Sequence, residues 1–258
     1  MTNEDMLRKA MEQSARDSSC REEDFLSHSN IVVESKPHPQ ARRYLKLPFA
    51  CDLVSYGTNI VASVSRELVD EVRNYINSYP VEHCFETPNL HVLNDLLKRH
   101  GLAICFMAEY FLPDLERLTA LSCPYSLRLL MPDEFSALYL PQWENALCGR
   151  RKELDKLALG AYDGDTLVGL AGCSVDCDTM WQIGVDVLPA YRRQGIASAL
   201  TSGLALEILN REKVPFYCAA WSNLKSVRNA LKSGFSPAWV ELTAKELSFI
   251  EDCNRLSG

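Results

Sequence analysis

A basic turn that contains a glycine is the stretch of this sequence best suited to chemistry. It reads Arg192-Arg193-Gln194-Gly195-Ile196-Ala197 and follows a β-prone segment that ends at Pro189. After it, apolar residues spaced four apart predict a helix over about 195–210. The first N–H groups of a helix lack internal partners, and the helix dipole favours an anion there. Because Gly195 and Ala197 leave room for close approach and the arginines add charge, the turn predicts a diphosphate site.

Two common phosphate-binding motifs do not fit this turn. It lacks the three glycines of GxGxxG, so it is not a dinucleotide-binding turn of the Rossmann type. It also lacks the Gly-Lys-Ser/Thr of a P-loop. A nucleotide-binding α/β domain of another kind stays open as an alternative.

A second motif lies downstream, between a predicted strand at 216–221 and a predicted helix at 223–232. The helix opens with Asn223-Leu224-Lys225-Ser226, where Asn223 is typical of an N-cap. It ends before Gly234, which is typical of the position that follows a helix.

Together the two motifs resemble the GNAT superfamily of N-acetyltransferases over residues 126–258. The family pattern Gln/Arg-x-x-Gly-x-Gly/Ala is filled by Arg192, Gly195 and Ala197, after an approach that contains Val187 and Pro189. The family also has Asn-x-x-Ser/Ala before its last helix and Gly-Phe after it. Among relatives, the run at 232–241 is most similar to a two-part bacterial type with an N-terminal α/β segment. The resemblance implies acetyl-CoA as co-substrate, held by Val187, Leu188, Arg192, Arg193, Gln194, Gly195, Ile196, Ala197, Ser198, Asn223 and Ser226.

Two residues that assist the reaction in many relatives are replaced here. The position of a tyrosine that protonates the CoA sulfur is occupied by Ala230, and the strand before the turn has Gln182 where a glutamate is common. A general base must lie within hydrogen-bond reach of the amine, directly or through one water. Asp186 and Tyr217 are the candidate catalytic residues, although a hydrogen-bonded aspartate and a core tyrosine are the alternative interpretations.

Strands and helices alternate along the chain, which predicts a mixed α/β fold. A proline-bounded stretch at 113–124 separates two such patterns. We therefore expect a smaller N-terminal α/β domain over 1–125, as a lid or a selector of the acceptor, and a GNAT domain over 126–258.

Composition excludes several classes of protein. The formal net charge is −7 and the basic groups are short, which argues against nucleic-acid binding. The N-terminus lacks the pattern of a signal peptide, and no apolar run approaches the roughly 18 residues of a membrane span. The ten cysteines are scattered without a CxxC pair, so we expect reduced thiols, no metal site and a cytoplasmic protein.

The sequence thus predicts an acetyl-CoA-dependent N-acetyltransferase. An amine would attack the acetyl thioester directly in a ternary complex. The acceptor is a small-molecule or peptide primary amine that the sequence does not identify, and the oligomeric state, a homodimer included, stays open. The alternative is a non-catalytic acyl-CoA-binding sensor or scaffold.

Overall fold

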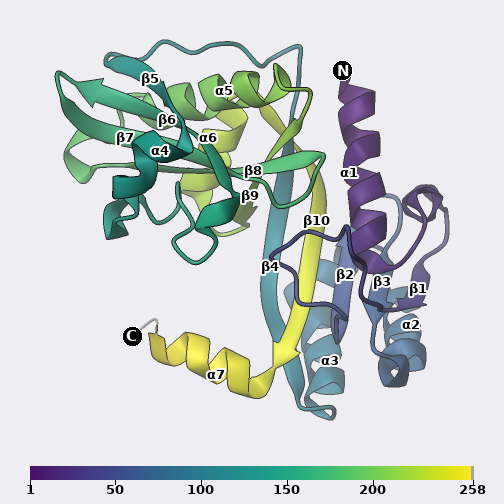
Figure 1. Ribbon diagram of the computed structural model, residues 1–258. Coiled ribbons are helices and arrows are strands. Elements are labelled where there is room, and N and C mark those ends of the chain that lie inside the picture. Colours follow the sequence, from purple (N-terminus) through teal and green to yellow (C-terminus); the bar gives the residue numbers. More distant parts are fainter. Residues whose placement is uncertain (257–258) are drawn as a thin grey trace. The chain divides into compact units, whose positions relative to one another are not determined.

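The computed structural model describes residues 1–256, which form two compact units, each described here by itself (Figure 1). The first unit comprises Met1–Lys9 and Tyr110–Pro237, and the second comprises Ala10–Glu109 and Ala238–Gly258. The C-terminal segment therefore belongs to the unit built from the N-terminal part of the chain. The expected division into 1–125 and 126–258 stays a prediction about function, while the compact units divide the chain differently.

The sheet of the first unit has the order β4-β9-β8-β7-β6-β5. Neighbours from β5 to β8 are antiparallel, while β8 and β9 are parallel. A tight turn that contains Gly164 joins β6 and β7, which pair from Asp163 and Thr166 onward. The strands are β4 (Leu102–Pro113), β5 (Ser126–Leu130), β6 (Asp155–Asp163), β7 (Thr166–Ser174), β8 (Met180–Val187) and β9 (Val214–Ala220). Only the part of β4 from Tyr110 onward belongs to this unit, and the part up to Glu109 belongs to the second.

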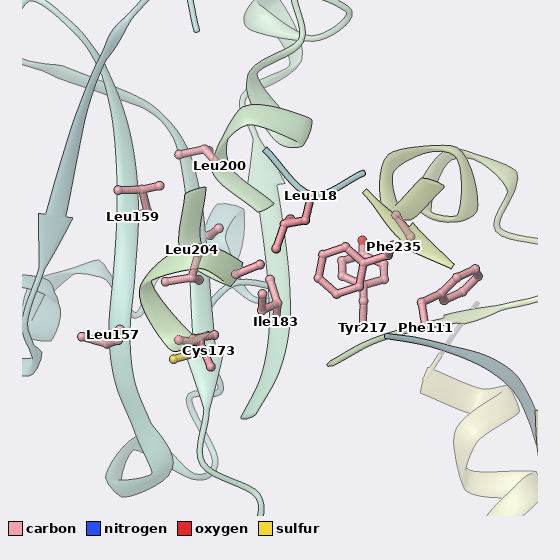
Figure 2. Packing of buried hydrophobic residues seen from close by; sticks show 14 of the residues in the cluster. Phe111, Leu118, Leu157, Leu159, Cys173, Ile183, Leu200, Leu204, Tyr217 and Phe235 are labelled. Atoms are coloured by element: carbon pink, nitrogen blue, oxygen red, sulfur yellow. The ribbon is translucent and has the colours of Figure 1, made fainter. Parts of the chain in front are cut away.

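Helices cover both faces of this sheet, with α5 (Ile196–Leu209) on one face and the short α4 (Pro132–Phe135) on the other (Figure 1). The face under α5 forms the larger core, to which β6, β7 and β8 contribute alternate residues. Figure 2 shows this core, in which the side chains of Leu200 and Leu204 lie near Leu159 and Ile183. The core also includes α6 (Leu224–Lys232) through Ala230. Since α5 is surrounded by apolar contacts, its position relative to β8 is well determined by packing.

The second unit has the strand order β1-β3-β2-β10-β4 and its own apolar core. Strands β2 and β3 form an antiparallel hairpin, and α2 follows them in the chain. The elements are α1 (Asn3–Ser18), β1 (Ile31–Glu34), β2 (Cys51–Ser55), β3 (Val61–Val64), α2 (Val69–Asn77), α3 (Thr87–Lys98), β10 (Phe235–Glu246) and α7 (Leu247–Leu256).

The second unit also contains a group of buried charged side chains. The Arg42 guanidinium pairs with the carboxylates of Asp17 and Glu241, the latter at 3.0 Å. Asp52 lies beside them, and its carboxylate accepts a hydrogen bond from Thr243. Burial, followed by the nearby Glu241 carboxylate, raises the pKa of Asp52 well above its ordinary value.

The mixed α/β class is confirmed, with an additional α/β segment alongside the part expected to be GNAT. The ten cysteines carry free thiols. Across residues 1–256, no helix has the length and apolar character needed to cross a membrane.

Candidate functional site

The site is built where β8 and β9 separate. Their parallel pairing covers Met180 to Gln182 on β8 and Val214 to Phe216 on β9, and it ends there among the described residues. Both strands continue, β8 over 183–187 and β9 over 217–220. The edge of β8 that faces β9 is therefore open beyond Gln182.

The open edge of β8 presents backbone groups. The N–H of Leu188 donates to the Val168 carbonyl at 2.9 Å, on the β7 side. Because backbone groups alternate along a strand in an antiparallel ladder, the N–H groups of Val187 and Val185 point the other way. An extended ligand between the strands could accept hydrogen bonds from these N–H groups. The Leu188 N–H is already engaged, so Val187 offers the free amide at this end.

The basic turn follows at once and leads into α5 as expected. Gly195 is the N-cap residue of α5 and has φ +84°, a left-handed conformation that favours glycine. Arg193 also has a positive φ, +67°. Among residues 1–256, no side chain caps this end of α5, so its first N–H groups face outward without a side-chain partner.

Three cations surround this helix end. Arg192 and Arg193 are exposed on the turn, and the Nε of Arg192 donates to the Val187 carbonyl at 3.0 Å. The third is Lys232 at the end of α6, which the sequence analysis did not single out. Its Nζ lies 3.9 Å from the place that a Cβ on Gly195 would occupy. In the described part of the chain, neither Arg193 nor Lys232 has an ion-pair partner, so the positive charge at the turn is not neutralised.

The other predicted ligands at the turn have different surroundings. The Gln194 side chain accepts a hydrogen bond from the Tyr125 hydroxyl at 2.9 Å. The side chains of Ile196 and Ser198 are buried, so only their backbone could contact a ligand. Ala197 is half-buried and small. The turn therefore offers mainly backbone N–H groups, with arginine and lysine side chains around them.

The second motif lies at the start of α6. The Asn223 side chain accepts a hydrogen bond from the Ser226 N–H, which confirms Asn223 as the N-cap. The Ser226 hydroxyl lies 2.7 Å from the Tyr217 hydroxyl. Tyr217 is buried and its ring packs edge to face against Phe235 (Figure 2). Burial raises the pKa of Tyr217, so its hydroxyl stays protonated at neutral pH.

Asp186 lies on the opposite face of β8 from the α5 core. Its Oδ2 accepts the backbone N–H groups of Asn145 and Ala146, at 2.9 and 3.0 Å. Its Oδ1 accepts the side-chain amide of Asn145 at 2.7 Å. The two candidate catalytic residues, Asp186 and Tyr217, thus point to opposite faces of the sheet.

A further pair on the Asp186 face was not anticipated. Gln182 on β8 donates its amide to the sulfur of Cys218 on β9, at 2.9 Å. The contact spans the point where the strands separate. This contact depends on the register between β8 and β9, which lie far apart in the chain. Local sequence patterns do not specify that register, so they could not predict the pair. Within residues 1–256, no group of three or more histidine, cysteine, aspartate or glutamate side chains is arranged to hold a metal ion.

Residues 124–235 match the model of the acetyltransferase (GNAT) family. No curated protein matches the chain. Several solved structures match part of the chain at low similarity. A GCN5-related N-acetyltransferase-like protein from Streptococcus suis is 19% identical, with 62% of this chain and 69% of that chain covered and a TM-score of 0.45.

Two further structures are comparable. A GCN5-related N-acetyltransferase from Kribbella flavida is 16% identical, with 60% and 63% covered and a TM-score of 0.46. The yncA structure from Salmonella typhimurium, solved with its cofactor acetyl-CoA, is 15% identical, with 48% and 95% covered and a TM-score of 0.35. The chain spans 66%, 69% and 63% of the first three solved chains that it matches.

Proposed function

We propose that this protein is an acetyl-CoA-dependent N-acetyltransferase that moves the acetyl group to a primary amine by direct attack in a ternary complex. The observation that carries the proposal is the uncapped N-terminus of α5 at Gly195, beside the open edge of β8. Both lie within the segment that matches the GNAT family.

The residues at the turn fit a diphosphate. Among the described residues, and apart from the chain next to Gly195 itself, only the Lys232 ammonium lies within 4 Å of a Cβ built on Gly195, so a phosphate can approach the backbone N–H groups. Arg193 and Lys232 supply charge without a carboxylate partner in the described chain. Fixed donors and positive charge at one helix end are the features that a diphosphate requires.

When bound, acetyl-CoA supplies the thioester that the amine attacks. The Val187 N–H, which faces the open edge of β8, is placed to donate to the thioester carbonyl oxygen. The Tyr217 hydroxyl, which Ser226 orients at 2.7 Å, holds a proton that it can give to the leaving sulfur, and the proton that the attacking amine releases restores the hydroxyl through solvent. Holding both substrates in place supplies much of the remaining acceleration.

A non-catalytic acyl-CoA sensor is the second candidate function. Two observations favour it: Gln182 pairs with Cys218 where many relatives have a glutamate, and the Asp186 oxygens are occupied by hydrogen-bond donors. A sensor would bind CoA as an enzyme does but would release no thiol.

Calorimetric titration of the full chain with CoA tests the site. We expect binding, and we expect Gly195→Glu to weaken it by about 100-fold, equivalent to ~2.8 kcal/mol, since a carboxylate would stand where the diphosphate lies. Absent binding, or binding that Gly195→Glu leaves unchanged, would refute the proposed site. Release of free thiol from acetyl-CoA with a broad panel of primary amines then separates enzyme from sensor. Turnover on any amine excludes the sensor.

A further inference from the structure

Two glycines that face each other across β7 and β8 allow a loop to lie directly on the sheet. Gly172 and Gly184 are register partners. A Cβ on Gly184 would lie 1.8 Å from the Asn145 carbonyl oxygen, and one on Gly172 would lie 2.0 Å from the Ala146 carbonyl oxygen. No larger residue fits at either position unless the loop moves, because both contacts are with backbone.

The N–H groups of the same two loop residues bind Asp186. Its carboxylate accepts the N–H of Asn145 and of Ala146 on one oxygen and the Asn145 amide on the other. Farther along the segment 141–148, Trp143 and Leu147 are buried in the apolar cluster around α4. Three kinds of contact therefore hold the segment. Its apolar side chains are buried, its carbonyl groups pack on the two glycines, and its N–H groups donate to the Asp186 carboxylate.

This segment lies beside the place where the strands separate. Gly184 and Asp186 face away from the α5 core, because Ile183, Val185 and Val187 of the same strand face it. With α5 and α6 on the other face, an amine that reaches the open edge of β8 has to come from the side of segment 141–148. Asn145 is exposed there, next to that edge.

We infer that Asp186 is a positioning residue that holds segment 141–148 as one wall of the acceptor-amine site, and that it is not the general base. The inference rests on the proposed function for the identity of the acceptor. Three donors from segment 141–148 already occupy three of the about four lone-pair sites of the Asp186 carboxylate, which leaves one site on Oδ1. The carboxylate is instead the acceptor that determines where the Asn145 and Ala146 backbone lies.

Asp186→Asn and Asp186→Ala separate positioning from proton transfer. In the asparagine variant the remaining oxygen accepts both backbone N–H groups, and the Asn145 amide can turn to present its own oxygen. We expect Asp186→Asn to keep kcat within about threefold and to keep the shape of the pH–rate profile. We expect Asp186→Ala to raise the KM for the amine by about tenfold while the KM for acetyl-CoA is unchanged. Gly184→Ala, which moves the same segment from below, should act like Asp186→Ala.

A loss of about 100-fold or more in kcat for Asp186→Asn, together with loss of one limb of the pH–rate profile, would identify Asp186 as the base and overturn the inference. Hydrogen exchange on the full chain gives a readout that needs no turnover. The Asn145 and Ala146 amides should be protected in the wild type and in Asp186→Asn, and should exchange faster in Asp186→Ala. Unprotected amides in the wild type would refute the proposal that Asp186 holds segment 141–148. Absent CoA binding by the wild type would refute the proposed function but not the role of Asp186 in holding segment 141–148, so the two failures are distinguishable.

Discussion

Gly195→Ala tests the phosphate turn with the smallest possible change. At φ +84° an alanine is strained, and a left-handed conformation costs an L-residue about 1–2 kcal/mol. The added Cβ meets no other atom closer than the Lys232 Nζ at 3.9 Å, so no clash adds to that cost. For a chain of this size, 1 kcal/mol corresponds to a fall in Tm of about 2–4 °C. We therefore expect a folded protein with a modestly lower Tm.

CoA affinity should fall further than stability. The Cβ projects into the space between the backbone N–H groups and the Lys232 ammonium, which is the space that a phosphate needs. We expect Kd to rise by at least about tenfold, equivalent to ~1.4 kcal/mol, in calorimetric titration. The matched control is Gly164→Ala in the β6–β7 turn, where φ is +58° and nothing lies within 4 Å of the Cβ. It should lower Tm by a similar amount and leave Kd unchanged. A Gly195→Ala variant that loses stability but binds CoA like the wild type would refute a diphosphate at this turn.

Three further changes test other parts of the site. Lys232→Ala should weaken CoA binding by about fivefold, more at low salt, whereas Lys225→Ala on the same helix should not; equal effects would mean general charge and no specific contact. Tyr217→Phe should lower kcat by about 10-fold to 100-fold with little change in either KM, and an unchanged kcat would remove Tyr217 from the reaction. Burial raises the pKa of Asp155 to about 6, so its folded form binds a proton more tightly than its unfolded form. Protonated Asp155 therefore contributes stability that is full below about pH 4 and is lost as pH rises through 6. In the wild type the free energy of unfolding should fall by about 3 kcal/mol between pH 4 and 6, and in Asp155→Asn this fall should be absent. Denaturant unfolding measures both, and the same pH dependence in the two proteins would contradict the prediction.

The backbone of the turn at 192–197 could be predicted from the sequence because its features are local. The strand, the proline that follows it, the glycine at 195 and the helix after it depend on neighbouring residues. The same holds for Asn223, whose side chain caps the helix three residues later. These parts of the site depend on short-range hydrogen bonds and on helical periodicity, which sequence patterns describe well.

Other parts of the site depend on contacts between distant residues. Lys232 comes close to Gly195 only because α6 packs in the same core as α5. Asp186 meets Asn145, 41 residues earlier, with no periodic signal that connects them. A glycine within a strand often marks a close backbone approach, and Gly184 is such a glycine. Which segment approaches depends on the path of the loop, and no local pattern specifies that path.

Ala230 shows how such long-range packing changes the interpretation of a missing residue. Many relatives place a tyrosine there, and its loss alone argues against an acid at the sulfur. In this chain Ala230 is fully buried in the core that contains Tyr217 and Phe235. The side chain of α6 is therefore small at this position, whereas the side chain that β9 contributes to the same core is large. The Tyr217 hydroxyl reaches Ser226, one turn before Ala230 on α6. A hydroxyl supplied by β9 therefore lies against the same helix that usually carries it, and the small side chain at 230 leaves room in the core for the Tyr217 ring. The pair of residues, and neither one alone, decides whether the site has an acid.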